Sequence, residues 1–269
     1  MRARGIVVAS PRTLYPAARN MLSRMDRTFS GIDLAADPAK TGIATIQETP
    51  AGLTLIDATA SATDATLIAL VTGAELTGVD VPVGWPRAFR EFVSAHADQR
   101  MAAPATYGPD ERRRLVNRFT DLEVRRNAGV TPLPVAAERI AHPALRWAGV
   151  ESRLRAAGAN VDRDGHGRVA EVYPAAALKQ WGLRHRGYKG ADVAGRGARE
   201  EIAAGLTERF ELDWGGMQRR AVENADCLDA VIAALVAREV RAGRCIAPPS
   251  DQAELVAEEG WVWVPRPSA

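Results

Sequence analysis

The sequence contains little cysteine and no motif of closely spaced metal ligands. Its 269 residues include two cysteines, Cys227 and Cys245, and four histidines, with no HxxxH or CxxC spacing. So few cysteines exclude a disulfide-rich secreted domain and favour a reducing, cytoplasmic location. The missing ligand spacing argues against a zinc site.

Long hydrophobic runs are also absent. No apolar run approaches the roughly 20 residues that a membrane-spanning helix needs, so we expect no membrane partner. The basic segment 1–28 has one short apolar piece, residues 6–9, which is shorter than the roughly 7–15 apolar residues of a secretory signal. We therefore expect a flexible N-terminal extension over 1–28 and a single domain over 29–269, with a helical insertion over about 87–157.

The chain has no large excess of charge of either sign. Its formal net charge is +2, so composition by itself does not indicate a nucleic-acid-binding surface. Hydrophobic residues make up 46% and charged residues 25% of the chain, as in ordinary globular proteins. A chain of this length can bury a substantial core.

The first part of the domain has strand patterns separated by turns. Apolar residues in the segments 29–34, 41–46 and 51–58, joined by short loops, predict an antiparallel meander. An apolar stripe over 61–73 that ends at Gly73 predicts a helix. A strand that ends at Asp80 follows, and a helix between two strands indicates a crossover, so this strand should run parallel to a neighbour.

The rest of the chain is mostly helical in pattern. Further helices are predicted over 87–99, 112–129, 135–158, 174–182, 198–210 and 220–243. Asp164-Gly165 and Gly167 predict a hairpin over 160–174, with its return strand at 168–173. We expect a glycine-rich loop over 188–197 and a terminal strand within 258–265.

Acidic residues occupy positions that should face the core. Asp33 lies inside the first strand, and Asp80 ends the fourth strand in "GVDVPVGWP". Asp229 shares a helix face with five apolar residues, Val222, Ala225, Ile232, Val236 and Val240, and Asp226 flanks that face.

A buried carboxylate costs several kcal/mol unless a positive group neutralises it. Each acid alone is more commonly an ion-pair or capping residue, and arginine is abundant enough to pair with all of them. The joint pattern on two strands and one helix favours a cation instead, and Mg²⁺ or Mn²⁺ suits such oxygen ligands.

Six segments resemble a known family. The motifs "GIDLA", "GVDVPVGWP", "RFTDLEVRR", "EVYPAAALKQWG", "CLDAVIAAL" and "EGWVWVP" resemble the domain of unknown function 429 family, which is described as predicted nucleases of the ribonuclease H-like superfamily. The resemblance covers about residues 29–265. It implies an α/β fold with a mixed five-stranded sheet, an antiparallel meander plus parallel strands, flanked by helices. "NADCLDAVIAAL" is also similar to the last-helix motif of Holliday-junction resolvases.

The resemblance also implies roles for the acids. Asp33 would bridge two Mg²⁺ or Mn²⁺ ions, Asp80 and Asp229 would complete the metal site, and Asp226 would be a helper or an alternative. Glu171 in "EVYP" is either a fourth ligand or substrate contact, or an outward-facing strand residue. The implied activity is hydrolysis of phosphodiester bonds by a two-metal mechanism.

Further residues are candidates for substrate binding. Arg118, Asp121 and Arg125 have helical spacing, so they form either a phosphate-binding face or a solvated charged face. Lys189 in "GYKG" either reaches a phosphate or lies in a surface loop. Trp85 either stacks on a base or plugs its proline-flanked loop.

Three functions therefore compete. The first is a nuclease acting on structured DNA or RNA. The second is a phosphotransferase of the actin and sugar-kinase type, although "DLAADPAKTG" lacks the Asp-x-Gly-Thr phosphate loop of that class. The third is a non-catalytic module that binds nucleic acid or protein. The oligomeric state is open, and a homodimer is one option.

Overall fold

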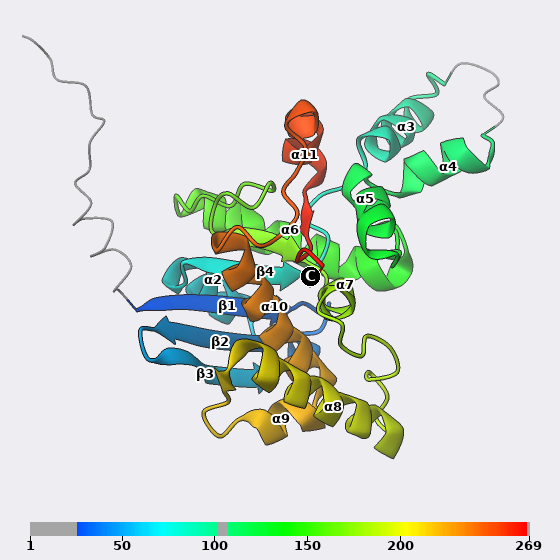
Figure 1. The fold of residues 1–269 in the computed structure, drawn as a ribbon. Helices are drawn as coiled ribbons and strands as arrows, with labels where there is room; N and C mark the ends of the chain where they lie inside the picture. The colour runs from blue at the N-terminus through cyan, green and yellow to red at the C-terminus, as the bar shows by residue number, and fades with distance from the viewer. Residues whose placement is uncertain (1–25, 102–106, 268–269) are drawn as a thin grey trace, which may run out of the picture.

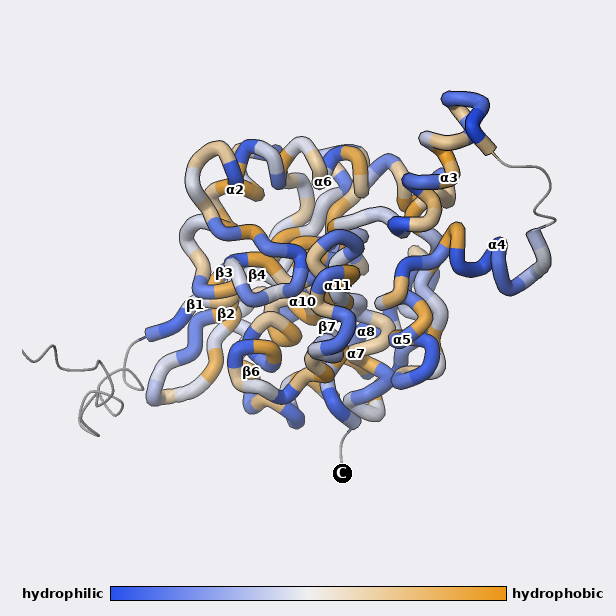
Figure 2. Tube along the Cα trace, turned by 90° about the horizontal axis from the view of Figure 1, so that it is seen from above, coloured by the Kyte–Doolittle hydropathy of each residue, from blue (hydrophilic) through white to orange (hydrophobic). Residues whose placement is uncertain are grey.

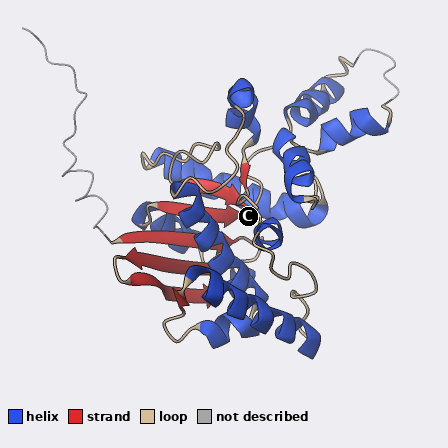
Figure 3. Cartoon of the chain, viewed as in Figure 1, coloured by secondary structure: helices blue, strands red, loops and turns tan. Residues whose placement is uncertain are grey.

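The computed structural model describes residues 26–101 and 107–267, which form an α/β fold around one mixed sheet (Figure 1 and Figure 3). In this part of the chain the sheet has seven strands, in the order β6-β3-β2-β1-β4-β5-β7. The strands are β1 Arg27–Asp33, β2 Gly42–Thr49, β3 Gly52–Ala60, β4 Leu76–Asp80, β5 Val169–Val172, β6 Leu212–Asp213 and β7 Val262–Trp263.

The mixture of antiparallel and parallel strands is confirmed. β2 pairs antiparallel with both β1 and β3, and β4 runs parallel to β1, as the helix between them predicts. The expected number of five strands is wrong, because the two-residue strands β6 and β7 extend the sheet at its edges. Most of the predicted extension 1–28 lies outside the described residues, and Arg27 and Thr28 already belong to β1.

Helices cover both faces of the sheet (Figure 2). On one face lie α2 Asp64–Gly73 and α6 Glu138–Ala156. On the other face lie α8 Val193–Phe210, α9 Gln218–Glu223 and α10 Ala225–Arg241. α10 packs directly on the central strands, so this helix determines what faces the sheet on that side.

Strand alternation divides the core in two. Phe29 of β1 packs in the cluster under α10, whereas Ile32 packs in the cluster under α2 and α6. Successive strand residues point to opposite faces, so Phe29, Gly31 and Asp33 share the α10 side. The same alternation in β4 places Leu76, Gly78 and Asp80 on that side.

The first part of the predicted insertion, about 87–157, contains α3 Arg87–Ala97, α4 Pro109–Val116 and α5 Phe119–Ala128, and α3 and α4 extend away from the sheet (Figure 1). The last part of the predicted insertion forms α6, which packs on the sheet instead. The predicted single helix over 112–129 is wrong, because Arg118 is extended (φ −71°, ψ 162°) and separates α4 from α5. The Asp121 carboxylate accepts the Arg118 backbone N–H at 2.9 Å and so caps the new helix.

The predicted hairpin over 160–174 is also wrong. The return segment forms β5, but the residues before it form turns, and the Asn160 carbonyl accepts the Arg168 N–H at 2.8 Å. β5 is paired on both sides by the parallel strands β4 and β7, which leaves no edge for an antiparallel partner.

Two more predicted boundaries are wrong in the segment after α7 Pro174–Gln180, because capping residues start helices there. The predicted loop over 188–197 ends early, because the Asp192 side chain accepts the Gly195 N–H at 2.8 Å and starts α8. The predicted helix over 220–243 is divided, because Asn224 is extended and its side chain accepts the N–H groups of Asp226 and Cys227.

The tail adds α11 Ala253–Glu259 and the predicted terminal strand β7, and the short helices η1 Pro38–Lys40 and η2 Ser250–Gln252 occur in loops. Trp261 and Trp263 are buried against the main cluster, as expected. Among the described residues, no helix combines the length and the apolar character that crossing a bilayer requires.

Candidate metal centre

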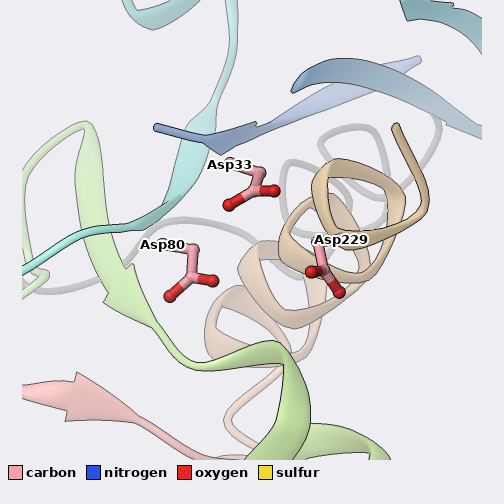
Figure 4. A group of neighbouring side chains, drawn as sticks. All are labelled: Asp33, Asp80 and Asp229. Carbon is pink, nitrogen blue, oxygen red and sulfur yellow. The ribbon is translucent and has the colours of Figure 1, made fainter. Parts of the chain in front are cut away.

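Three carboxylates from distant parts of the chain meet at one end of the sheet. The parallel register of β1 and β4 pairs Asp33 with Asp80, so both acids end their strands side by side. The first turns of α10 bring Asp229 opposite them, and Figure 4 shows all three side chains pointing into one space. One carboxylate oxygen from each lies within 4.8 Å of the others. The three candidate metal ligands are therefore brought together.

Two glycines allow α10 to lie close enough for this meeting. A Cβ atom on Gly31 would lie 1.9 Å from the Ala230 carbonyl oxygen, and one on Gly78 would lie 2.2 Å from that of Ala233. Each glycine stands two residues before a strand acid and on the same face. The repeated G-x-D pattern thus couples close helix packing to the placement of Asp33 and Asp80.

Asp229 is fully buried, and its two oxygens have different surroundings. The Tyr188 hydroxyl donates to Oδ1 at 2.8 Å. Lys189 Nζ lies 2.6 Å from Oδ2 as an ion pair, but Oδ2 receives no hydrogen bond of good geometry. Three carboxylates that surround one space, with one largely exposed lysine as an ion-pair partner, are an oxygen donor set that a hard cation fits.

Burial and mutual repulsion raise the pKa values of the two strand acids, Asp33 and Asp80. Burial, followed by the charges of Asp229 and Asp80, holds the pKa of Asp33 well above its ordinary value. Burial likewise raises the pKa of Asp80 to about 7, against the attraction of Lys189. In the described residues no arginine is paired with any of the three acids, so the arginine ion pairs that the sequence also allowed are not formed.

Lys189 brings a positive charge into direct contact with the cluster. Burial alone would lower the pKa of its ammonium group, but the three carboxylates raise that pKa above its ordinary value. Its side chain is nevertheless 59% exposed, because the loop that carries it lies at the surface. Lys189 therefore lies in a surface loop, as one alternative expected, and pairs with Asp229, while its contact with a phosphate stays a prediction.

The other two candidate acids lie outside this group of three. Asp226 is half-buried in the first turn of α10, where its charge contributes to the raised pKa of Asp33. Glu171 is buried and accepts hydrogen bonds from Arg118 at 2.6 and 2.7 Å and from the Val83 N–H at 3.1 Å. Glu171 is thus neither outward-facing nor a free ligand.

The proposed phosphate-binding face of Arg118, Asp121 and Arg125 is not formed. Arg118 and Asp121 are buried, whereas Arg125 is exposed. The five N–H groups of the Arg118 guanidinium are used by Asp121, Glu171 and the Glu259 carbonyl. Arg118 therefore joins α5 to the sheet and has no donor left for a phosphate.

Trp85 does not reach the three acids. It is half-buried, packs against the core under α2 and α6, and stacks on Phe89 with ring centroids 6.2 Å apart. These contacts fit a side chain that plugs its proline-flanked loop.

Sequence reasoning missed Tyr188, the two glycines and Glu259. The Glu259 carboxylate accepts the backbone N–H groups of Arg87 and Phe119, both at 2.7 Å, and so ties α11 to the insertion. The G-x-D repeat was a readable signal for the glycines. Tyr188 and Glu259 lie in a loop and at a helix end, where no periodic pattern indicates what a side chain contacts.

Comparison with known proteins gives one match. A family model described as a protein of unknown function, DUF429, matches residues 31–254, a range that includes the three acids. Neither the curated proteins nor the solved structures that were compared gave a match.

Proposed function

The chain belongs to the DUF429 family, whose function is unknown, and we propose that it is a metal-dependent nuclease that hydrolyses phosphodiester bonds in nucleic acid. The observation that carries this proposal is the meeting of Asp33, Asp80 and Asp229 around one space, where one largely exposed lysine is the ion-pair partner of Asp229. Such a site concentrates negative charge that a divalent cation would relieve.

The strand order supports the proposal. The five inner strands follow the order β3-β2-β1-β4-β5, with an antiparallel meander and then parallel strands, as expected for the ribonuclease H-like fold. The acids lie on the first strand, the fourth strand and the late helix α10, where the resemblance to that superfamily places metal ligands. We infer a ribonuclease H-like nuclease on these two grounds together.

The proposed ligands are Asp33, Asp80 and Asp229, with Mg²⁺ or Mn²⁺ as the cations. Two such ions would supply an activated water molecule and charge stabilisation for the leaving oxygen. The resemblance to the ribonuclease H-like superfamily assigns the bridging role to Asp33, and all three acids lie close enough together to share cations. Tyr188 orients Asp229 through its hydroxyl, and the exposed Lys189 can leave Asp229 and donate to a phosphate oxygen.

A phosphotransferase of the sugar-kinase type is less well supported. The loop between β1 and β2 would have to hold a nucleotide phosphate, yet its Thr41 is fully buried. The Thr41 hydroxyl oxygen accepts a hydrogen bond from Arg146 at 2.7 Å. The loop also contains the short helix η1 instead of an open glycine-rich turn.

The metal titration of an Asp33 variant tests the proposal. We expect Mn²⁺ to bind the wild-type protein in a calorimetric titration, and Asp33→Asn to weaken that binding by at least about 100-fold, the upper range for loss of a supporting group at a metal site. Asp57→Asn is the matched control, because Asp57 is a half-buried acid of β3 outside the cluster.

A panel of single-stranded, double-stranded and branched DNA and RNA then measures cleavage in Mn²⁺. Substrate phosphate completes many such sites, so the titration is repeated with a short duplex, and with ATP for the kinase alternative. If wild type and Asp33→Asn stay equally silent to metal under all these conditions, the acids are structural and the nuclease proposal fails.

A further inference from the structure

A pocket of about 410 Å³ opens beside the three acids. We call it the side pocket and define it by residues from four segments of its lining. They are Asp80 at the end of β4, Leu133 in the loop between α5 and α6, Arg139 at the start of α6, and residues 185–189 between α7 and α8. Because Asp80 and Lys189 line it, a group held in this pocket lies next to the candidate metal centre.

The side pocket carries positive charge that the protein leaves unpaired. Arg139 and Arg186 line it, both are exposed, and neither side chain makes a hydrogen bond or ion pair within the described residues. Arg118 and Glu171 also line it but neutralise each other. Most arginines of the described chain have an acid or a carbonyl as partner, so two unpaired guanidinium groups on one pocket favour an anionic ligand. Their forked donors match phosphate oxygens.

The pocket also offers apolar surface. Leu133 is 55% exposed, and both Leu133 and Ile140 line the pocket. Tyr173 contributes an aromatic ring, and its hydroxyl makes no hydrogen bond within the described residues. Aromatic and aliphatic side chains of this kind can pack against an unstacked base, and this contact does not depend on which base it is.

We propose that the side pocket binds one unpaired nucleotide of the substrate, its phosphate at Arg139 and Arg186 and its base against Leu133 and Tyr173. The inference rests on the proposed nuclease function and deepens it, because it selects single-stranded or frayed nucleic acid. The volume lies within the range of roughly 300–1,000 Å³ for small-ligand pockets, and a stacked duplex cannot enter such a space. The nucleotide must therefore leave its stack before it binds.

The test is binding of nucleoside monophosphates to the full-length protein. Calorimetry with adenosine 5′-monophosphate and thymidine 5′-monophosphate compares wild type with the double variant Arg139→Gln and Arg186→Gln. The matched control is the double variant Arg114→Gln and Arg266→Gln, which removes the same charge from exposed residues outside the pocket. We expect the first pair to weaken binding about tenfold or more, the effect of one lost charge-assisted hydrogen bond, and the control to change it less than twofold.

Three outcomes would overturn the inference. They are equal binding by wild type and the Arg139 and Arg186 variant, an equal loss in the control, and cleavage of a closed duplex as fast as of single strands. These outcomes leave the Asp33→Asn titration untouched, so failure of the side pocket is separable from failure of the metal centre. Unfolding is a remote concern, because both arginines are exposed and make no contact that holds the fold.

Discussion

Lys189 places an ammonium group where a divalent cation would relieve the same charge. Its Nζ lies 2.6 Å from Asp229 Oδ2, and the other two acids attract it as well. In the metal-free protein this lysine therefore stabilises three carboxylates that would otherwise repel one another. Any divalent cation bound by those carboxylates competes with it.

Replacing Lys189 should separate its stabilisation of the metal-free cluster from its competition with a divalent cation. We expect Lys189→Met to lower the metal-free stability by about 1–2 kcal/mol, since a lost buried pair costs more but this side chain is largely exposed. We also expect it to tighten Mn²⁺ binding by about tenfold, because a nearby positive charge is gone. Thermal unfolding and calorimetry measure the two effects.

Lys179→Met is the control for loss of one positive charge. Lys179 lies on α7, and its Nζ donates to the Gly129 carbonyl instead of to an acid. Weaker Mn²⁺ binding by the Lys189 variant would contradict the competition and make the lysine a partner of the metal site.

At the scale of elements, the approach of α10 to the sheet builds the site. Gly78→Ala would place a methyl group 2.2 Å from the Ala233 carbonyl, so the helix must move away from β4. We expect a loss of about 1–3 kcal/mol in stability, typical of overpacking, together with weaker Mn²⁺ binding because Asp229 moves with the helix. Chemical denaturation and metal titration on the same sample measure both changes.

Gly149→Ala in α6 is the matched control. A Cβ atom there meets nothing within 4 Å, so alanine should instead stabilise the helix by up to about 1 kcal/mol. A Gly78 variant with unchanged metal binding would show that α10 does not set the distance between the acids.

Apolar segments bounded by turn or capping residues were predictable from sequence, and helix ends fixed by side-chain contacts with distant residues were not. The apolar runs of β1, β2 and α2 and the alternation of β3 depend on neighbouring residues, so local sequence is sufficient to predict these elements. The break at Arg118 depends on Glu171, which lies 53 residues away and fixes the arginine in the core. No local period carries that information.

Prediction of the candidate metal centre has the same limit, because local sequence does not reveal contacts between distant residues. The sequence predicted that Asp33, Asp80 and Asp229 would face the core, because the first two lie in apolar strands and the third lies on the apolar face of a helix. The contacts of Tyr188 and Lys189 depend on the path of an irregular loop, so the sequence left Lys189 open and Tyr188 unnoticed. Both alternatives for Arg118, phosphate binding and a solvated charged face, missed its buried position because its acidic partner on β5 was not recognisable from spacing.

At the scale of the whole molecule, ion pairs between distant elements account for much of the balanced charge. Arg146 and Arg153 pair with Asp64 and join α6 to α2, while Arg87 pairs with Glu258 and joins α3 to α11. The acids of the metal centre are left out of this arginine pairing. The acids paired with arginine and the acids of the metal centre should therefore make opposite contributions to the pH dependence of stability.

The sign of the response at the cluster follows from the raised pKa of Asp80. Its ordinary value is 3.8, and burial raises it to about 7 in the folded protein. Between these pH values the folded state binds more protons at Asp80 than the unfolded state does, so rising pH destabilises the fold. The salt-bridged Asp64 acts oppositely, because hydrogen bonds from Arg146 and Arg153 hold its pKa below the ordinary value against the opposing effect of burial.

Comparing wild type with Asp80→Asn measures this contribution together with the effect of the Asp80 charge on Asp33, while the arginine ion pairs are shared. We expect the metal-free wild type to lose stability relative to the variant as pH rises from about 4 to 7, by at most about 4 kcal/mol, at 1.36 kcal/mol per pKa unit. Saturating Mn²⁺ should reverse the trend in wild type alone, because metal ligands must be deprotonated to bind. Urea unfolding at several pH values measures the difference. Parallel pH profiles for the two proteins would mean that Asp80 titrates normally, and the cluster would then lack the mutual repulsion on which a cation site depends.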